Sequence, residues 1–127
     1  WRRVDRFGRL LALYTGADVD VVRRFALFHD SQRYNDEKDP GHGERGAHRA
    51  RQYCADELTR EQMQLLHLAC TGHEGGITSD DATVGTCWDA DRLDLGRVGI
   101  RPRPDLLCTK AARDPETREW AFRRSLE

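Results

Sequence analysis

The chain has 127 residues, a formal net charge of −1, 34% charged residues and 38% hydrophobic residues. This length predicts one domain that can bury a core, and the composition is too apolar for a disordered chain. The balanced charge gives no overall attraction to nucleic acid or to an anionic membrane, and no apolar run reaches the roughly 18 residues of a transmembrane helix. We therefore expect neither a nucleic-acid polymer nor a membrane as a partner.

The cysteine pattern indicates a reducing compartment. The four cysteines form no CxxC pair, which argues against zinc-ribbon and thioredoxin-like sites, and their neighbours are apolar or small. Such positions are typical of reduced, buried thiols, and no signal-peptide pattern is present. We predict a cytoplasmic protein with free thiols at Cys54, Cys70, Cys87 and Cys108.

Apolar residues recur at three- and four-residue steps along nearly the whole chain, which predicts an all-α fold. The first helix ends at Gly16. Its apolar face contains Val4, Phe7, Leu11 and Tyr14. A second helix spans about 18–30, with Asp18 as its N-cap, and places His29 on the inward face. A polar loop is expected over 31–43, directly after this helix.

The rest of the chain continues the helical pattern. Further helices are expected over about 44–54, from a capping box at Thr59–Gln62 to Cys70, over about 81–95 and over 106–112. A last helix is expected over 114–126, with Asp114 as its N-cap and Pro115 at its first position. On the helix at 81–95, Asp91 shares the apolar face, whereas Asp89 lies off it. We predict a single compact helical bundle over 1–127, with a core of about 1–112 and a C-terminal helix of about 114–126.

Acidic residues interrupt two apolar stretches. The dipeptide His29-Asp30 ends the apolar run 21–28, and Asp91 interrupts a second apolar face. A desolvated carboxylate is costly unless it is paired or bound to a metal. A histidine bonded to a carbonyl, or an aspartate paired with an arginine, would explain each residue singly. A metal ion held between two helices explains both at once.

Together, these residues resemble the HD-domain superfamily of metal-dependent phosphohydrolases. The run Phe25–Asp30 resembles the apolar lead-in to the family's His-Asp dipeptide, and Ala90–Leu93 resembles its closing aspartate motif. The likeness covers residues 1 to about 112 and is greatest for small, stand-alone bacterial members. It implies an all-α bundle with metal ligands at His29, Asp30 and Asp91.

The resemblance also implies a first histidine ligand, three residues before Arg3-Val4, and that position would immediately precede Trp1. Because the chain opens inside a helical pattern and without methionine, we expect this histidine to lie in a part of the protein that the sequence does not include. If it is absent from the protein, the chain would be a catalytically degenerate HD fold that serves as a binding module.

His42 and His73 each lie beside glycines. Some members of the family carry two additional histidines between the His-Asp pair and the last aspartate, where they bind a second metal, and these two positions resemble them. A solvated loop histidine or a substrate contact is the alternative for each. Imidazole and carboxylate ligands suit Mn, Fe, Ni, Zn or Mg, so we expect one or two divalent ions.

The resemblance implies that a metal-activated water hydrolyses a small phosphorylated substrate, a nucleotide or a related phosphoester. Asp30 and Arg92 are the predicted catalytic residues. Arg45 and Arg92 could each bind a substrate phosphate, although Arg92 could equally pair with Asp89 or Asp94 on its own helix. Two metals would also suit a di-iron oxygenase of the HD fold, which is the alternative activity. The oligomeric state stays open, a homo-oligomer included.

Overall fold

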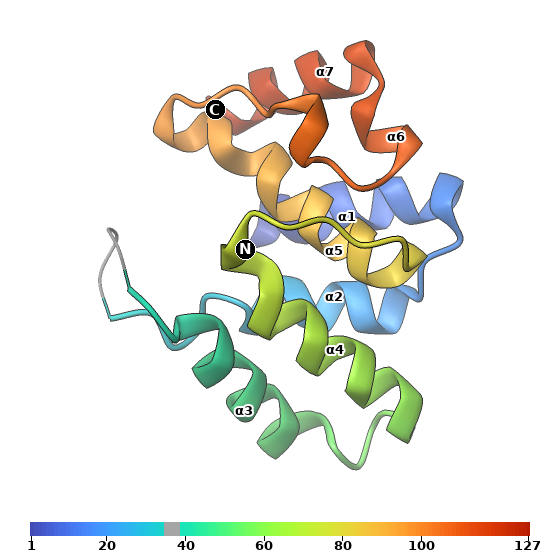
Figure 1. The fold of residues 1–127 in the computed structure, drawn as a ribbon, viewed down its shortest axis with the longest axis vertical. Helices are drawn as coiled ribbons and strands as arrows, with labels where there is room; N and C mark the ends of the chain where they lie inside the picture. The colour runs from blue at the N-terminus through green and yellow to red at the C-terminus, as the bar shows by residue number, and fades with distance from the viewer. Residues whose placement is uncertain (35–38) are drawn as a thin grey trace.

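Helices make up the fold in the computed structural model, which describes residues 1–34 and 39–127 (Figure 1). The α-helices of this part of the chain are α1 (Arg2–Thr15), α2 (Val19–Phe28), α3 (His42–Cys54), α4 (Arg60–Gly72), α5 (Ala82–Leu93), α6 (Lys110–Arg113) and α7 (Pro115–Ser125). Three 3₁₀ turns accompany them: η1 (His73–Gly75), η2 (Asp94–Val98) and η3 (Pro104–Leu106). The described residues contain no strand, which confirms the predicted all-α bundle.

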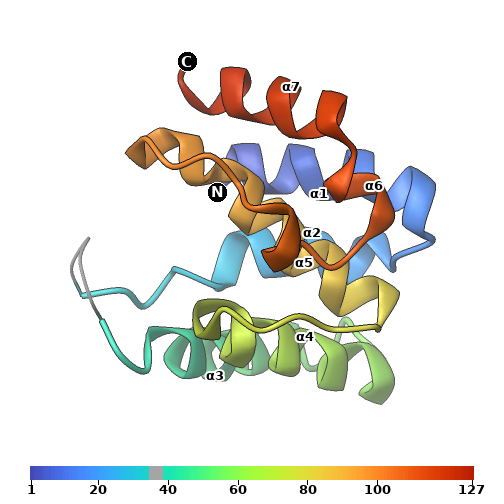
Figure 2. The same ribbon diagram turned by 45° about the horizontal axis from the view of Figure 1, so that its top comes forward.

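The helices stack in layers, which are seen from another side in Figure 2. α3 and α4 pack together on one side, α1, α2 and α5 lie in the middle, and α7 covers the other side. α2 is central because it contacts α1, α3, α4 and α5. Its side chains Val21, Val22 and Phe25 are fully buried. Gly8 lets α1 approach closely, since a Cβ there would lie 2.4 Å from the side chain of Val22.

The ends of several helices follow the predicted local signals. Gly16 ends α1 in the left-handed region at φ 75°. Asp18 caps α2 by accepting backbone hydrogen bonds, and Asp114 does the same for α7. Thr59 and Gln62 form the capping box that begins α4. These predictions are confirmed.

Tyr14 does not lie on the buried face of α1. It is 82% exposed, because the buried stripe of α1 ends at Leu11 and Ala12. The half-buried Thr15 follows Tyr14, and its hydroxyl oxygen lies 2.8 Å from that of Thr86 on α5. The start of α3 also differs from the prediction: the helix begins at His42, inside the expected loop 31–43. Residues 35–38 of that loop lie outside the described residues.

Asp89 is completely buried, although the helical pattern placed it off the apolar face of α5. Its carboxylate accepts hydrogen bonds from the backbone N–H groups of Cys108 and Thr109 at 2.6 and 2.8 Å. These bonds hold the link before α6 in an extended form. The helix predicted over 106–112 is therefore shorter, and α6 begins only at Lys110. None of the described helices is long and apolar enough to cross a lipid bilayer.

Candidate metal centre

His29 and Asp30 lie at the end of α2, in the middle of the bundle. His29 is 2% exposed, and its ring stacks on Phe25. Its Nδ1 lies 2.9 Å from the carbonyl oxygen of Phe25, so this nitrogen carries the proton and donates it to the backbone. The lone pair of Nε2 then faces the carboxylates of Asp30 and Asp91, whose nearest oxygens lie 3.4 and 3.3 Å away.

His42 enters the same region from the first turn of α3. The helix can approach the end of α2 because residue 46 is glycine: a Cβ at Gly46 would lie 2.4 Å from the carbonyl oxygen of Phe28. Nδ1 of His42 lies 2.8 Å from the carbonyl oxygen of Asp39. Its Nε2 lies 3.0 Å from Oδ1 of Asp30.

His73 begins the turn η1 that follows α4. Its Nδ1 lies 2.6 Å from the carbonyl oxygen of Cys70. Its Nε2 lies 3.0 Å from Nε2 of His42 and 3.3 Å from Oδ1 of Asp30. Gly43 allows this closeness of α3 and α4, since a Cβ there would lie 2.4 Å from the same Cys70 carbonyl oxygen.

The fold thus brings together all the side chains that were predicted as metal ligands. Two overlapping sets have ligand atoms within 4.8 Å of one another: His29, His73 and Asp91 in one set, and Asp30, His42 and His73 in the other. The three histidines are buried. The side chains of Asp30 and Asp91 are 34% and 19% exposed, so the cluster is open to solvent on its carboxylate side.

The tautomers of the histidines fit a cation within the cluster. Each Nδ1 has a backbone carbonyl as partner, so each neutral ring directs the lone pair of Nε2 inward. Two of these lone pairs, on His42 and His73, face each other at 3.0 Å with Oδ1 of Asp30 close to both. Acceptors crowded in this way repel one another unless a proton or a cation lies among them, and the Arg33 guanidinium, with Nη1 3.4 Å from Nε2 of His42, is one such cation. A divalent ion with nitrogen and oxygen ligands meets that need, so the residues present fit a metal.

Where no metal is bound, protons on the histidines can supply the positive charge among these acceptors. Burial opposes a charge on His29, but the hydrogen bond and charge of Asp91, together with Asp30, raise the pKa of the imidazole above 6.5. Burial also opposes a charge on Asp30, yet the contact with His73 and the charges of the three histidines hold its pKa well below 3.8. His29 lowers the pKa of Asp91 in the same way, against its burial. The site therefore favours ionised carboxylates beside cations.

The predicted substrate-binding arginines have protein partners of their own. Arg45 donates to Asp39 at 2.7 Å, and its guanidinium lies 3.8 Å from the ring centroid of Tyr34. Arg92 is 7% exposed and donates from Nη1 to the carbonyl oxygen of Leu106 at 2.7 Å, while its buried Nη2 has no hydrogen-bond partner among the described residues. The substrate role of both arginines, and the catalytic role of Arg92, stay predictions.

Sequence reasoning missed two residues beside the cluster. Nη1 of Arg33 lies 3.8 Å from Oδ1 of Asp30 and 3.4 Å from Nε2 of His42. Oε2 of Glu74 lies 2.9 Å from Nδ1 of His42. The spacing of three residues between Asp30 and Arg33 is a signal that could have suggested the first contact. The second contact joins distant parts of the chain, and no local pattern indicates it.

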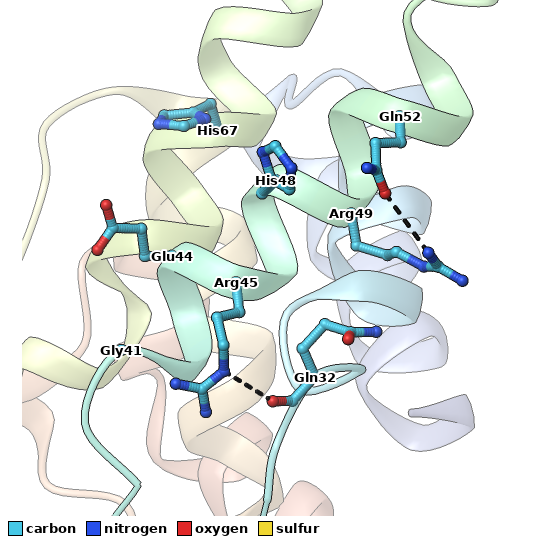
Figure 3. Close-up of a pocket in the computed structure, with 8 residues that line it drawn as sticks. All are labelled: Gln32, Gly41, Glu44, Arg45, His48, Arg49, Gln52 and His67. Atoms are coloured by element: carbon cyan, nitrogen blue, oxygen red, sulfur yellow. Dashed lines mark hydrogen bonds between the residues drawn. The ribbon is translucent and has the colours of Figure 1, made fainter.

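A groove runs along α3, the helix that His42 begins (Figure 3). Its volume of about 610 Å³ is in the range of small-molecule pockets, about 300–1,000 Å³. At one end lies Gly41, which precedes His42, and there Arg45 donates to the carbonyl oxygen of Gln32 at 3.2 Å. The lining residues are Gln32, Gly41, Glu44, Arg45, His48, Arg49, Gln52 and His67.

Comparison of the chain with protein-family models, with curated proteins and with solved structures found no match. The likeness to HD domains therefore stays an interpretation of the residues. The structure supports a coarser conclusion: the chain is a small all-helical domain with a buried His/Asp cluster that could hold a metal ion.

Proposed function

We propose that the chain is an HD-type phosphohydrolase that uses a divalent metal to hydrolyse a small phosphorylated substrate, a nucleotide or a related phosphoester. The observation that carries this proposal is the meeting of three imidazole Nε2 atoms with two partly exposed carboxylates. Ligands on separate helices are held rigidly and leave coordination positions open for water and substrate.

The chain's own residues have distinct roles in this proposal. A divalent ion bound here would lower the pKa of a water molecule and polarise a phosphoryl oxygen. The histidines would hold it through Nε2. Asp30 connects the two ligand sets. Its Oδ1 faces His42 and His73 of its own set, and its Oδ2 faces His29 of the other set. The exposed side of Asp30 and Asp91 is where water and substrate can enter.

Arg33 is the residue that we propose to bind the phosphoryl group. Its guanidinium lies against ligand atoms of both Asp30 and His42. An arginine in this place can bind a phosphoryl group held at the cluster through its charge and its N–H donors. The groove of Figure 3, with Arg45 near its Gly41 end, would then take the remainder of the substrate.

One observation favours the second candidate, a di-iron oxygenase. The two ligand sets overlap at His73, and such neighbouring sets of histidines and carboxylates also suit paired irons. Metal analysis after aerobic purification, together with an oxygen electrode, separates the two activities. Bound iron with substrate-dependent oxygen consumption would replace the hydrolase proposal.

The experiment that tests the proposal is a hydrolysis assay with a chromogenic phosphate ester and a panel of nucleotides, each supplied with Mn²⁺, Ni²⁺, Zn²⁺ or Mg²⁺. We expect turnover with at least one metal and loss of turnover in Asp30→Ala. Asp80→Ala is the control, because Asp80 is an exposed aspartate that belongs to neither ligand set and does not line the groove. Equal turnover in wild type and Asp30→Ala, or none with any metal and substrate, would refute hydrolysis.

A further inference from the structure

Glu74 belongs to neither ligand set, yet its carboxylate contacts the start of α3 with both oxygens. Oε2 lies 2.9 Å from Nδ1 of His42. Oε1 accepts a hydrogen bond from the backbone N–H of Gly43 at 3.3 Å. The turn η1 therefore carries His73 into the cluster and Glu74 onto the ring of His42.

The contact uses the ring atom that a metal would leave free. Nε2 of His42 faces Asp30 and His73, so the proton of the ring lies on Nδ1, which donates to the carbonyl of Asp39 and has Oε2 of Glu74 at 2.9 Å. A carboxylate beside this N–H group stabilises the tautomer and, through its negative charge, makes the ligating nitrogen more basic. The carbonyl of Asp39 fixes the tautomer but carries no negative charge.

We infer that Glu74 is a positioning residue that strengthens the binding of the metal ion held by His42. The inference rests on the metal centre of the proposed function, but not on the reaction assigned to it. Helix capping is the competing explanation. Gly41, the N-cap residue of α3, makes no side-chain cap hydrogen bond, and an acidic group near a helix N-terminus is stabilising by itself.

Cobalt titration separates the two explanations. Co²⁺ is added to metal-free wild type, His42→Ala and Glu74→Gln, and its binding is followed by calorimetry and by visible absorbance. The ion that His42→Ala loses should bind about tenfold more weakly in Glu74→Gln, with an altered spectrum, because the supporting carboxylate is gone. If His42→Ala still binds an ion, that ion should bind to Glu74→Gln with the same affinity as to wild type.

Two controls test whether the effect passes through the histidine. Glu44→Gln removes the same charge from the exposed side of the first turn of α3 and should leave cobalt binding unchanged. In the His42→Ala background, Glu74→Gln should have no further effect on the ion that remains. Thermal unfolding of the metal-free variants shows that each is folded.

The inference is overturned if Glu74→Gln lowers the metal-free Tm but binds cobalt like wild type, which is the result expected of a helix cap. It is also overturned if the cobalt effect persists without His42, since the cause would then be overall charge. If the cobalt results agree with the inference but wild type hydrolyses no phosphoester, the inference stands and the proposed function fails.

Discussion

At the level of single residues, burial and neighbouring charges have opposite effects on the ionisation of His29, Asp30 and Asp91. His29 is almost fully buried, which alone would oppose a charge on its ring, and two carboxylate oxygens lie within 3.4 Å of its Nε2. The carboxylates reverse that effect and raise the pKa of the imidazole. A proton and a metal ion therefore compete for the same nitrogen.

This competition predicts opposite pH trends for metal-free and metal-bound protein. The raised pKa of His29 gives stability that is complete below pH 6.5 and is lost as the pH rises through the folded-state pKa. The lowered pKa values of Asp30 and Asp91 give stability that is present above pH 3.8 and is lost as the pH falls. Without metal, the stability that Asp91→Asn removes should thus be greatest between these values and should decline as the pH rises through the folded-state pKa of His29.

Metal affinity should instead rise with pH, because binding must displace the proton of His29. Urea unfolding of chelator-treated wild type and Asp91→Asn measures how the stability of the metal-free protein depends on pH. Zinc titration at pH 6, 7 and 8 measures how the metal affinity depends on pH. A zinc affinity that does not change over this range would contradict the assignment of His29 as a ligand.

The difference between Asp89 and Asp91 marks the limit of sequence reasoning at this scale. Helical spacing selected Asp91 for the site, and the structure does place it against His29. The same spacing wrongly assigned Asp89 to the outer face. Nearly every residue of α5 is buried, so the helix has no polar face, and periodicity cannot separate a metal-facing acid from one that holds a backbone link.

At the scale of helices, the site depends on glycines where α3 meets its neighbours. Gly46→Ala would place a Cβ 2.4 Å from the carbonyl oxygen of Phe28, so α3 must move away from the end of α2. We expect a loss of about 1–3 kcal/mol in unfolding free energy and weaker metal binding, since His42 moves with the helix.

Urea unfolding and metal titration of this variant test the expectation. Gly75→Ala is the control, because a Cβ there meets only Cγ1 of Ile77, at an ordinary 4.0 Å. If Gly46→Ala binds metal and unfolds like wild type, the close approach of the two helices does not position His42.

Asp89 connects two other elements, and its removal should be costly. Asp89→Ala leaves the partly buried N–H groups of Cys108 and Thr109 without their acceptor, which we expect to lower the unfolding free energy by about 3 kcal/mol. Asp80→Ala, at an exposed position, should change it little. Urea unfolding measures both. A loss in Asp89→Ala as small as in Asp80→Ala would show that the link before α6 does not need this acceptor.

Local signals predicted the helix ends well, and tertiary contacts account for the errors. The N-caps bond to backbone N–H groups within one turn, so a short stretch of sequence is enough to predict where these helices begin. This holds for Asp18, Thr59 and Asp114. The shortened helix at 106–112 depends on Asp89 from α5, and the exposure of Tyr14 depends on what α1 meets in the fold. Neither cause is visible in the local sequence.

The metal cluster exists only when the whole bundle is assembled. His29 follows α2, His42 begins α3, His73 follows α4 and Asp91 lies on α5. The sequence could predict these ligands because their residue types and neighbours are distinctive. It could not predict the contacts of Glu74 and Arg33 with His42, because these depend on how η1 and the segment after α2 meet α3.

Because the ligands are apart in the unfolded chain, a bound metal should stabilise the fold by linkage. At a free-ion concentration 100 times Kd, we expect about 2.7 kcal/mol of added stability. Thermal unfolding with and without the ion measures it as a rise in Tm that a chelator reverses. His73→Ala, which removes the member that both ligand sets share, should show no such rise, and a rise equal to that of wild type would mean that the ion binds elsewhere.

Equilibrium binding of a divalent metal, with its stoichiometry, tests the central claim most directly. Metal-free wild type, His73→Ala and His48→Ala are titrated with Zn²⁺. His73 belongs to both ligand sets, whereas His48 is an exposed histidine on α3. The account predicts one or two ions in wild type and in His48→Ala, and a large loss of affinity in His73→Ala. No zinc binding by wild type, or binding that His73→Ala leaves unchanged, would contradict it.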